Sequence, residues 1–219
     1  MHGTTCPENV MAVLTDLKTQ DPRRKATLLE NYLKMLKEKR RWAGLASSKA
    51  AHEPWDLVID SLGVIKVIGC RSGLEVADLG AGGGIVGLVM AIVCETIEVC
   101  LIESSSRKCA FLAEAVGSLG IRNAEVLCDR VENLHGRRSF NCVVSRAAGR
   151  LVDTLPAGLP ILRPGGIFVA VKGGGTGPEL EEARELFQAE GVRLEEPGGR
   201  ELKDAASLGR ASLVVVRKV

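Results

Sequence analysis

From Gly73 onward, short β-branched runs alternate with helical stretches. The predicted strands are Leu74–Asp78, Glu98–Glu103, Ala124–Cys128, Asn141–Ser145 and Ile167–Lys172. The predicted helices are Ile85–Cys94, Ser106–Leu119 and Glu179–Gly191. Such alternation builds a parallel sheet with right-handed crossovers. Two last runs, Gly191–Glu195 and Ser212–Arg217, have no helical pattern between them, which indicates an antiparallel pair. We therefore predict an α/β Rossmann-like fold with a seven-stranded, mostly parallel sheet.

The residues before Gly73 have a helical pattern. One apolar stripe comprises Val10, Val13, Leu14 and Leu17, and a second comprises Leu28, Leu29, Tyr32, Leu33 and Leu36. A third apolar segment, residues 55–68, is too long for a strand, and a glycine-containing turn at 69–73 follows it. We predict a helical N-terminal segment over residues 1–72 and an α/β domain over residues 73–219.

Positive charge is concentrated in this N-terminal segment. Between Lys18 and Lys49 there are ten Lys or Arg and three Asp or Glu, although the net charge of the chain is only +2. Such an asymmetry is typical of a face that binds a polyanion. A solvated helix surface is the alternative. The candidate contacts on this segment are Lys37, Arg40 and Arg41.

Cysteine usage and hydropathy constrain the environment of the protein. The seven cysteines are scattered without a C-x-x-C pair, so we expect neither a disulfide framework nor a zinc site. The first residues lack a signal-peptide pattern. The longest apolar run, Ile85–Cys94, is far shorter than the ~20 residues that span a bilayer. We predict a cytoplasmic monomer without a membrane partner.

The stretch Asp78-Leu-Gly-Ala-Gly-Gly-Gly-Ile-Val-Gly87 stands at a predicted strand-to-helix turn. Read from Gly82, it matches the G-x-G-x-x-G loop of dinucleotide-binding proteins. Read from Asp78, it is an acidic residue followed by alternating glycines, which suits a ligand without phosphate. Both interpretations place the ligand at the carboxyl edge of the sheet. Both also expect an acidic residue, here Glu103, to bind ribose hydroxyls.

Three features favour S-adenosylmethionine over NAD. A carboxylate at Asp78 would repel a pyrophosphate but could accept hydrogen bonds from the α-ammonium group of the methyl donor. The turn Leu162-Arg-Pro-Gly-Gly166, placed before the fifth strand, is typical of methyltransferases. A terminal antiparallel pair completes the seven-stranded methyltransferase sheet, whereas the dinucleotide fold is normally parallel. We therefore predict an S-adenosylmethionine-binding methyltransferase domain over residues 73–219.

Four further motifs resemble the glucose-inhibited division protein B family, also called ribosomal RNA small subunit methyltransferase G. They are Asp60-Ser61-Leu62 at the end of a predicted helix, Asp129-Arg130-Val131-Glu132, Ser145-Arg146-Ala147 and Val171-Lys172-Gly173. The resemblance implies a class I methyltransferase fold with N-terminal helices. It also implies methylation of guanine N7 in 16S ribosomal RNA, free or in the small subunit.

The resemblance also implies roles for individual residues. Gly80, Gly82 and Ile85 would line the methionine and ribose portion of the donor, with Asp78 at the start of the loop. Glu103 would bind the ribose, and Val131 and Glu132 the adenine. Arg146 would lie in the reaction pocket beside the sulfonium, and Lys172 would contact RNA. Capping of a helix carboxyl end is the alternative for Arg146.

The chain departs from the family pattern at several positions. Leu57 replaces a histidine, Ile85-Val86 replaces Phe-Pro, and residues 44–46 and Ala211-Ser212 also differ. Two other functions stay open: a methyltransferase of the same fold acting on a small molecule or a protein, and a NAD-binding Rossmann oxidoreductase.

Overall fold

The computed structural model describes residues 5–17, 19–39, 54–146, 149–173, 176–195 and 211–219. Arg40, Arg41 and the family difference at 44–46 lie outside these residues. The strands are β1 Glu75–Leu79, β2 Glu98–Glu103, β3 Ala124–Cys128, β4 Phe140–Arg146, β5 Leu162–Lys172, β6 Val192–Glu195 and β7 Ser212–Lys218. Each predicted strand is present. The bounds of β2 and β3 are as predicted, and the other strands differ at one or both ends, most at the start of β5.

The seven strands form one sheet in the order β3-β2-β1-β4-β5-β7-β6. Strands β1 to β5 are parallel to one another, and β7 pairs antiparallel with both β5 and β6. This confirms the predicted mostly parallel sheet with its terminal antiparallel pair. Because β1 to β5 run in one direction, their carboxyl ends meet at a single edge of the sheet.

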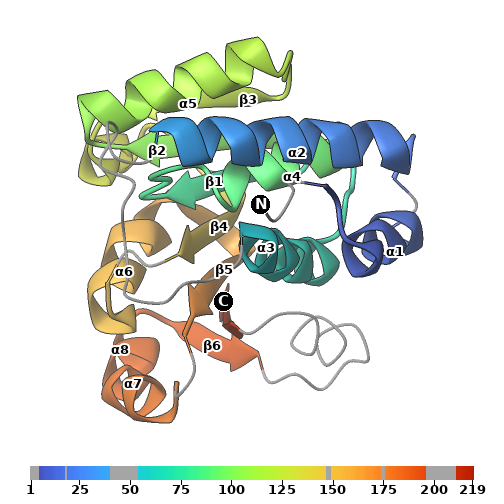
Figure 1. Cartoon of the computed structure of the whole chain (residues 1–219). Helices are drawn as coiled ribbons and strands as arrows, with labels where there is room; N and C mark the ends of the chain where they lie inside the picture. Colours follow the sequence, from blue (N-terminus) through green and yellow to red (C-terminus); the bar gives the residue numbers. More distant parts are fainter. Residues whose placement is uncertain (1–4, 18, 40–53, 147–148, 174–175, 196–210) are drawn as a thin grey trace.

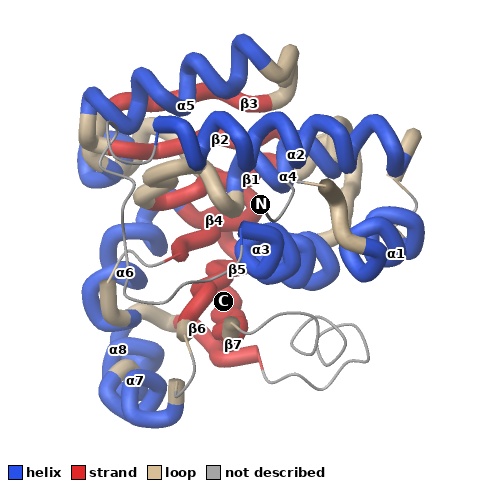
Figure 2. Tube along the Cα trace, viewed as in Figure 1, coloured by secondary structure: helices blue, strands red, loops and turns tan. Residues whose placement is uncertain are grey.

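Helices cover both faces of the sheet (Figures 1 and 2). The α-helices are α1 Glu8–Asp16, α2 Pro22–Lys39, α3 Pro54–Ile68, α4 Gly87–Val93, α5 Ser106–Ser118, α6 Leu151–Gly158, α7 Gly177–Glu182 and α8 Arg184–Ala189. Two short 3-10 helices, η1 Val131–Leu134 and η2 Leu159–Ile161, complete the described elements. Alternate residues of the strands point to two buried apolar clusters, one for each face.

The N-terminal helices share the apolar cluster of the first face with α4, α5 and the strands. The predicted stripes are confirmed, since Val10, Leu14, Leu29 and Leu33 are all at most 1% exposed. Helix α2 begins at Pro22, a residue suited to a first helical position, and the Asp21 carboxylate accepts a hydrogen bond from the backbone N–H of Arg24. The division at residue 72 stays a prediction.

Two local predictions are wrong, and one helix was missed. Asp60-Ser61-Leu62 does not end a helix, because α3 continues to Ile68. The predicted helix Glu179–Gly191 is divided at Ala183 into α7 and α8. Helix α6 was not predicted, since its eight residues include Pro156 and its carboxyl end is Gly158, both poor helix formers.

The turn at residues 162–166 lies inside β5 rather than before it. Leu162 pairs with Phe140 and Ile167 pairs with Cys142, so the four residues between them bulge out of the β4–β5 ladder. Gly165 has a φ of 74°, a conformation that favours glycine.

The structure also corrects the expectation for the cysteines. Cys70, after α3, and Cys94, after α4, form a disulfide with their Cα atoms 5.4 Å apart. They are separated by 24 residues in the sequence, so no local spacing motif announced the pair. Cys6, Cys100, Cys109, Cys128 and Cys142 are free thiols.

Candidate functional site

The glycine-rich loop joins β1 to α4 at the carboxyl edge of the sheet. We call residues 80–86 the donor loop. Gly80, Gly82 and Gly84 have φ values of 69°, 58° and 79°, which glycine adopts without a Cβ penalty. Gly80 is exposed, and Gly82 and Ile85 are partly exposed. Gly80 and Gly82 therefore leave this part of the loop free of side chains, and Ile85 adds an apolar one.

Gly87 follows the donor loop and begins α4. It is buried, and a Cβ at this position would overlap the side chain of Leu101 and crowd the carboxylate of Asp78. The absence of a side chain thus lets α4 pack directly against β1 and β2. Gly87, the third glycine of the G-x-G-x-x-G pattern that starts at Gly82, therefore serves helix packing.

Asp78 lies beneath the donor loop and is only 2% exposed. Its Oδ2 accepts a hydrogen bond of 2.8 Å from the backbone N–H of Gly87. Burial raises the pKa of Asp78 to about 7, although the Gly87 hydrogen bond and Arg146 oppose this shift. The hydrogen bond joins the end of β1 to the start of α4, on either side of the donor loop. Contact between Asp78 and the donor ammonium group stays a prediction.

Glu103 ends β2 beside the donor loop and is 6% exposed. Its Oε2 accepts a hydrogen bond of 3.0 Å from Gly82 N–H, and its Oε1 accepts one of 2.9 Å from Ser105 N–H. A carboxylate oxygen has a second lone pair, so Glu103 could still accept hydrogen bonds from ribose hydroxyls. The structure thus brings Glu103 and Gly82 together, as the predicted donor site requires.

Two side chains from the N-terminal helices also hold the donor loop. The hydroxyl of Tyr32 on α2 donates a hydrogen bond of 2.7 Å to the carbonyl of Gly83. The hydroxyl of Ser61 on α3 lies 2.9 Å from the carbonyl of Ile85. The sequence places Tyr32 only in an apolar stripe. Its phenol group was the one available signal of a polar role.

Arg146 ends β4, next to β1 in the sheet, where Ser145 pairs with Leu79. One guanidinium nitrogen, Nη2, lies 3.5 Å from Oδ2 of Asp60 on α3. The Arg146 side chain is 22% exposed, and burial lowers its pKa, opposed by Asp60, Tyr32 and Asp78. Arg146 therefore lies at the same edge as the donor loop. Its guanidinium pairs with a carboxylate in the middle of α3. This contact is not the helix-end capping that the alternative expected.

Val131 and Glu132 follow β3 in the short helix η1, which begins three residues after the end of β3. Val131 is buried and Glu132 is exposed. The carboxylate of Asp129 accepts hydrogen bonds from Arg130 N–H at 2.8 Å and from the Asn133 side-chain amide at 2.6 Å. These bonds order the turn between β3 and η1. Contact of Val131 and Glu132 with the adenine stays a prediction.

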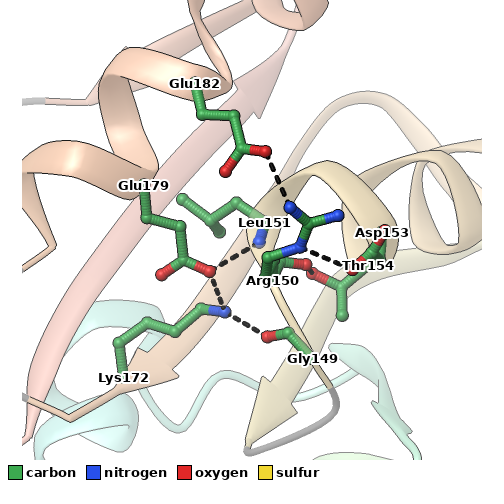
Figure 3. Close-up of polar contacts among 8 residues, drawn as sticks. All are labelled: Gly149, Arg150, Leu151, Asp153, Thr154, Lys172, Glu179 and Glu182. Carbon is green, nitrogen blue, oxygen red and sulfur yellow. Dashed lines mark hydrogen bonds and ion pairs between the residues drawn. The ribbon is translucent and has the colours of Figure 1, made fainter.

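Lys172 ends β5 and is held inside a polar cluster (Figure 3). Its Nζ donates to the carbonyl of Gly149 at 2.5 Å and to Oε1 of Glu179 at 2.8 Å. The same Glu179 oxygen accepts a hydrogen bond of 2.7 Å from Leu151 N–H at the start of α6. The Lys172 side chain is 12% exposed. Its contact with RNA stays a prediction, and the observed contacts tie β5 to α6 and α7.

The basic face of the N-terminal segment is partly described. Lys34 and Lys37 are exposed on α2. Arg24 and Lys25 instead pair with Glu95, and Lys39 pairs with Glu114 of α5. The unpredicted pairing of these three cations reduces the charge available to a polyanion.

A cleft of about 510 Å³ opens at the opposite edge of the sheet. Two of the three arginines that line it are engaged within the protein, because Arg163 pairs with Glu75 at 3.1 Å and Arg217 donates to Glu195 at 2.5 Å. The cleft lies at the amino ends of the parallel strands. Parallel α/β sheets bind ligands at the carboxyl ends, so the donor loop is the stronger candidate site.

The electrostatics of the donor loop match one of the two ligand classes. The carboxylate of Glu103 lies beside the loop, where a pyrophosphate would meet like charge, and Asp78 lies buried beneath it. A ligand with an ammonium group and ribose hydroxyls can instead donate to such oxygens. The residues present therefore fit S-adenosylmethionine better than NAD.

Comparison with known proteins finds sequences of one family that are similar to this chain. The sequence model of the family described as rRNA small subunit methyltransferase G matches residues 25–200. A protein of that name from Pelotomaculum thermopropionicum is 34% identical over 165 residues, which cover 74% of this chain and 68% of the relative. One from Clostridium novyi is 29% identical and covers 96% of this chain and 87% of its own length.

Solved structures show the same fold at low sequence identity. The Thermus thermophilus 16S rRNA N2 G1207 methyltransferase, in complex with AdoMet and guanosine, has a TM-score of 0.54 and 20% identity, covering 78% of this chain and 45% of that chain. The precorrin-6y C5,15-methyltransferase of Geobacter metallireducens has a TM-score of 0.54 and 14% identity, covering 79% and 93%. The fold is thus that of methyltransferases with different substrates. Fold alone does not select the substrate.

Proposed function

The chain belongs to the rRNA small subunit methyltransferase G family, and on this premise we propose that it transfers a methyl group from S-adenosylmethionine to N7 of a guanine in 16S ribosomal RNA. The observation that carries the proposal is the arrangement at the carboxyl edge. The donor loop, Glu103 and Arg146 come together there from β1, β2 and β4.

The donor supplies an activated methyl group on sulfur, and the protein contributes binding and orientation. Guanine N7 carries a lone pair and no proton at neutral pH, so a general base is not needed. The chain must instead hold N7 about 3–3.5 Å from the methyl carbon and in line with its bond to sulfur. Glu103 and the donor loop would orient the donor, and the Arg146 guanidinium would orient the base.

The chemistry of N7 also defines the form of the RNA. N7 lies on the major-groove edge, which side chains cannot reach within an A-form helix, so the target base would be unpaired. Only 3% of the residues are aromatic, and Trp55 is buried in the apolar cluster of the first face. Stacking on the planar guanidinium of Arg146 would therefore hold the target base.

Charged residues of α2 favour RNA over a small molecule or a protein as the substrate. Lys34 and Lys37 are exposed on this helix, and Arg40 and Arg41 follow it in the sequence. We infer that these cations contact phosphates, with the site accepting bare rRNA or the small subunit. Among the described residues, no helix is both long enough and apolar enough to cross a membrane. The cytoplasmic location and the monomeric state are part of this proposal.

The test is to incubate the protein with radiolabelled S-adenosylmethionine and one of three acceptors: bare small-subunit rRNA, intact small subunits or protein extract. Nucleoside analysis should place the label on N7-methylguanosine from an RNA acceptor. N7 methylation makes the base cationic, so borohydride reduction followed by aniline should cut the RNA at one guanine. Label on an exocyclic amine, or in protein alone, would contradict the proposal.

A further inference from the structure

Helix α3 presents two neighbouring polar side chains to the two halves of the candidate site. Asp60 and Ser61 lie in the middle of this helix and are 6% and 0% exposed. They are the sequence-predicted motif that neither the donor nor the RNA assignment used. Buried polar groups need partners, so their contacts identify what α3 holds in place.

Ser61 holds the donor side. Its Oγ lies 2.9 Å from the carbonyl of Leu57 in its own helix and 2.9 Å from the carbonyl of Ile85 in the donor loop. A serine hydroxyl has one proton, which these two carbonyls share. Removing the hydroxyl would leave the Ile85 carbonyl without this partner and free the donor loop to shift.

Asp60 holds the acceptor side. Its Oδ2 lies 3.5 Å from Nη2 of Arg146, and its Oδ1 accepts a hydrogen bond of 3.2 Å from Ala211 N–H before β7. The Asp60 side chain is 5% exposed and that of Arg146 is 22% exposed. A guanidinium this deep needs a counter-charge, and removing one member of a buried pair leaves the other uncompensated.

The charge of Asp60 also suits the proposed reaction. Methyl transfer moves a positive charge from the donor sulfur to the guanine base. An uncompensated Arg146 guanidinium beside that base would oppose the developing charge. A carboxylate on the far side of the guanidinium offsets this repulsion while leaving its planar face available.

We propose that Asp60 and Ser61 are positioning residues, with Ser61 setting the donor loop and Asp60 setting Arg146 from the same turn of α3. The inference rests on the proposed function and deepens it. Because both contacts come from one rigid helix, the distance between the donor methyl group and the target base depends on α3. A misplacement of about 1 Å can cost on the order of a hundredfold in rate.

The test separates the two halves of the site with Asp60→Asn and Ser61→Ala. Ser61→Ala should weaken S-adenosylmethionine binding about three- to tenfold by calorimetry, the effect of one lost hydrogen bond, and leave the single-turnover rate at saturating donor within about twofold. Asp60→Asn should do the reverse. It should keep donor affinity within about twofold and lower that rate at least ~10-fold.

Two exposed changes serve as matched controls. Asp16→Asn removes an exposed carboxylate that pairs with Lys66 of α3, and Ser118→Ala removes an exposed hydroxyl of α5. Both should leave donor affinity and rate unchanged. Arg146→Ala combined with Asp60→Asn should lose little more rate than Arg146→Ala alone, because the two residues act as one unit.

A merely structural role would lower both donor affinity and rate in each variant, together with the melting temperature, and this outcome would overturn the inference. Unchanged behaviour of both variants would also overturn it. The proposed function is tested independently by the wild-type product. If wild-type protein methylates a different atom, the proposed function fails. The opposite effects of the two variants on donor affinity and rate would still test whether Asp60 and Ser61 are positioning residues.

Discussion

At the residue scale, the carboxylate of Glu103, at the end of β2, already accepts two hydrogen bonds within the protein. It binds the donor loop through Gly82 N–H and the next turn through Ser105 N–H. The ribose assignment adds a third set of hydrogen bonds to the same carboxylate. Its removal should therefore affect both the shape of the site and the binding of the donor.

We expect Glu103→Ala to weaken S-adenosylmethionine binding by about 1–3 kcal/mol, the cost of leaving polar groups unpaired. Calorimetry with the donor measures the change. Glu98→Ala is the matched control, since Glu98 is exposed at the opposite end of the same strand. Equal losses in the two variants would show that Glu103 acts on the strand and not on the donor site.

Asp78 provides a second prediction, on stability. Its folded-state pKa, about 7, lies above the unfolded value near ~3.9. The folded protein therefore holds this proton more tightly, so stability is lost as pH rises from about 4 and the loss is complete above about 7. Asp78→Asn cannot ionise and avoids this loss.

The free energy of unfolding of Asp78→Asn relative to wild type should thus rise by at least ~1 kcal/mol between pH 5 and pH 8, as measured by urea unfolding. Asp153→Asn, at an exposed aspartate, should show no comparable rise. A difference between Asp78→Asn and wild type that stays constant with pH would mean that Asp78 has an ordinary pKa.

At the scale of elements, α2 joins the two halves of the proposed activity. One side of this helix carries Tyr32, which binds the donor loop, and another carries the exposed cations Lys34 and Lys37. Helical periodicity separates these groups onto different faces, so phosphate contacts and loop contacts need not compete. The ion pairs of Arg24, Lys25 and Lys39 orient the helix.

Changing Lys34 and Lys37 together to Ala should flatten the salt dependence of RNA binding. Each phosphate contact to single-stranded RNA contributes about −0.7 to the slope of log affinity against log salt, so the slope should flatten by about 1.4. Fluorescence anisotropy over a salt series measures this, with donor affinity as the internal control. An unchanged slope would leave this part of α2 as a solvated helix surface.

The disulfide links the ends of two other elements, α3 and α4. Under non-reducing, denaturing conditions, alkylation should modify five cysteines per chain, and all seven after reduction. Mass spectrometry distinguishes the two states. The variant Cys94→Ser should give six modified cysteines in both conditions. Seven modified cysteines in wild-type protein before reduction would mean that Cys70 and Cys94 are not bonded. A closed loop of this length stabilises a fold by about 3 kcal/mol.

At the scale of the whole molecule, the proposed reaction needs positioning and no proton transfer. A base-dependent reaction loses rate as its base becomes protonated. At saturating donor and RNA, where ionisation of Asp78 no longer limits donor binding, the single-turnover rate should therefore stay flat from about pH 6.5 to 8.5. A rate that climbs tenfold per pH unit would require a general base and would contradict direct attack by N7.

Much of the architecture could be predicted from the sequence alone. The alternation of β-branched and helical runs determined the strands, their parallel arrangement and the terminal pair, because strand and helix periodicities are local properties. Local patterns were less informative where packing overrides propensity. Helix α6 forms despite Pro156, and its buried residues Leu151 and Leu155 pack against the second face of the sheet.

The candidate site divides in the same way. The glycine loop, Glu103 and Arg146 were evident in the sequence because their chemistry stands at the ends of recognisable strands. Tertiary structure decided which groups hold them: Tyr32 and Ser61 on the donor loop, Asp60 on Arg146 and Glu179 on Lys172. The contact between Asp60 and Arg146 spans 86 residues of sequence. Only packing of α3 across the sheet brings these side chains together, and no local period encodes such a contact.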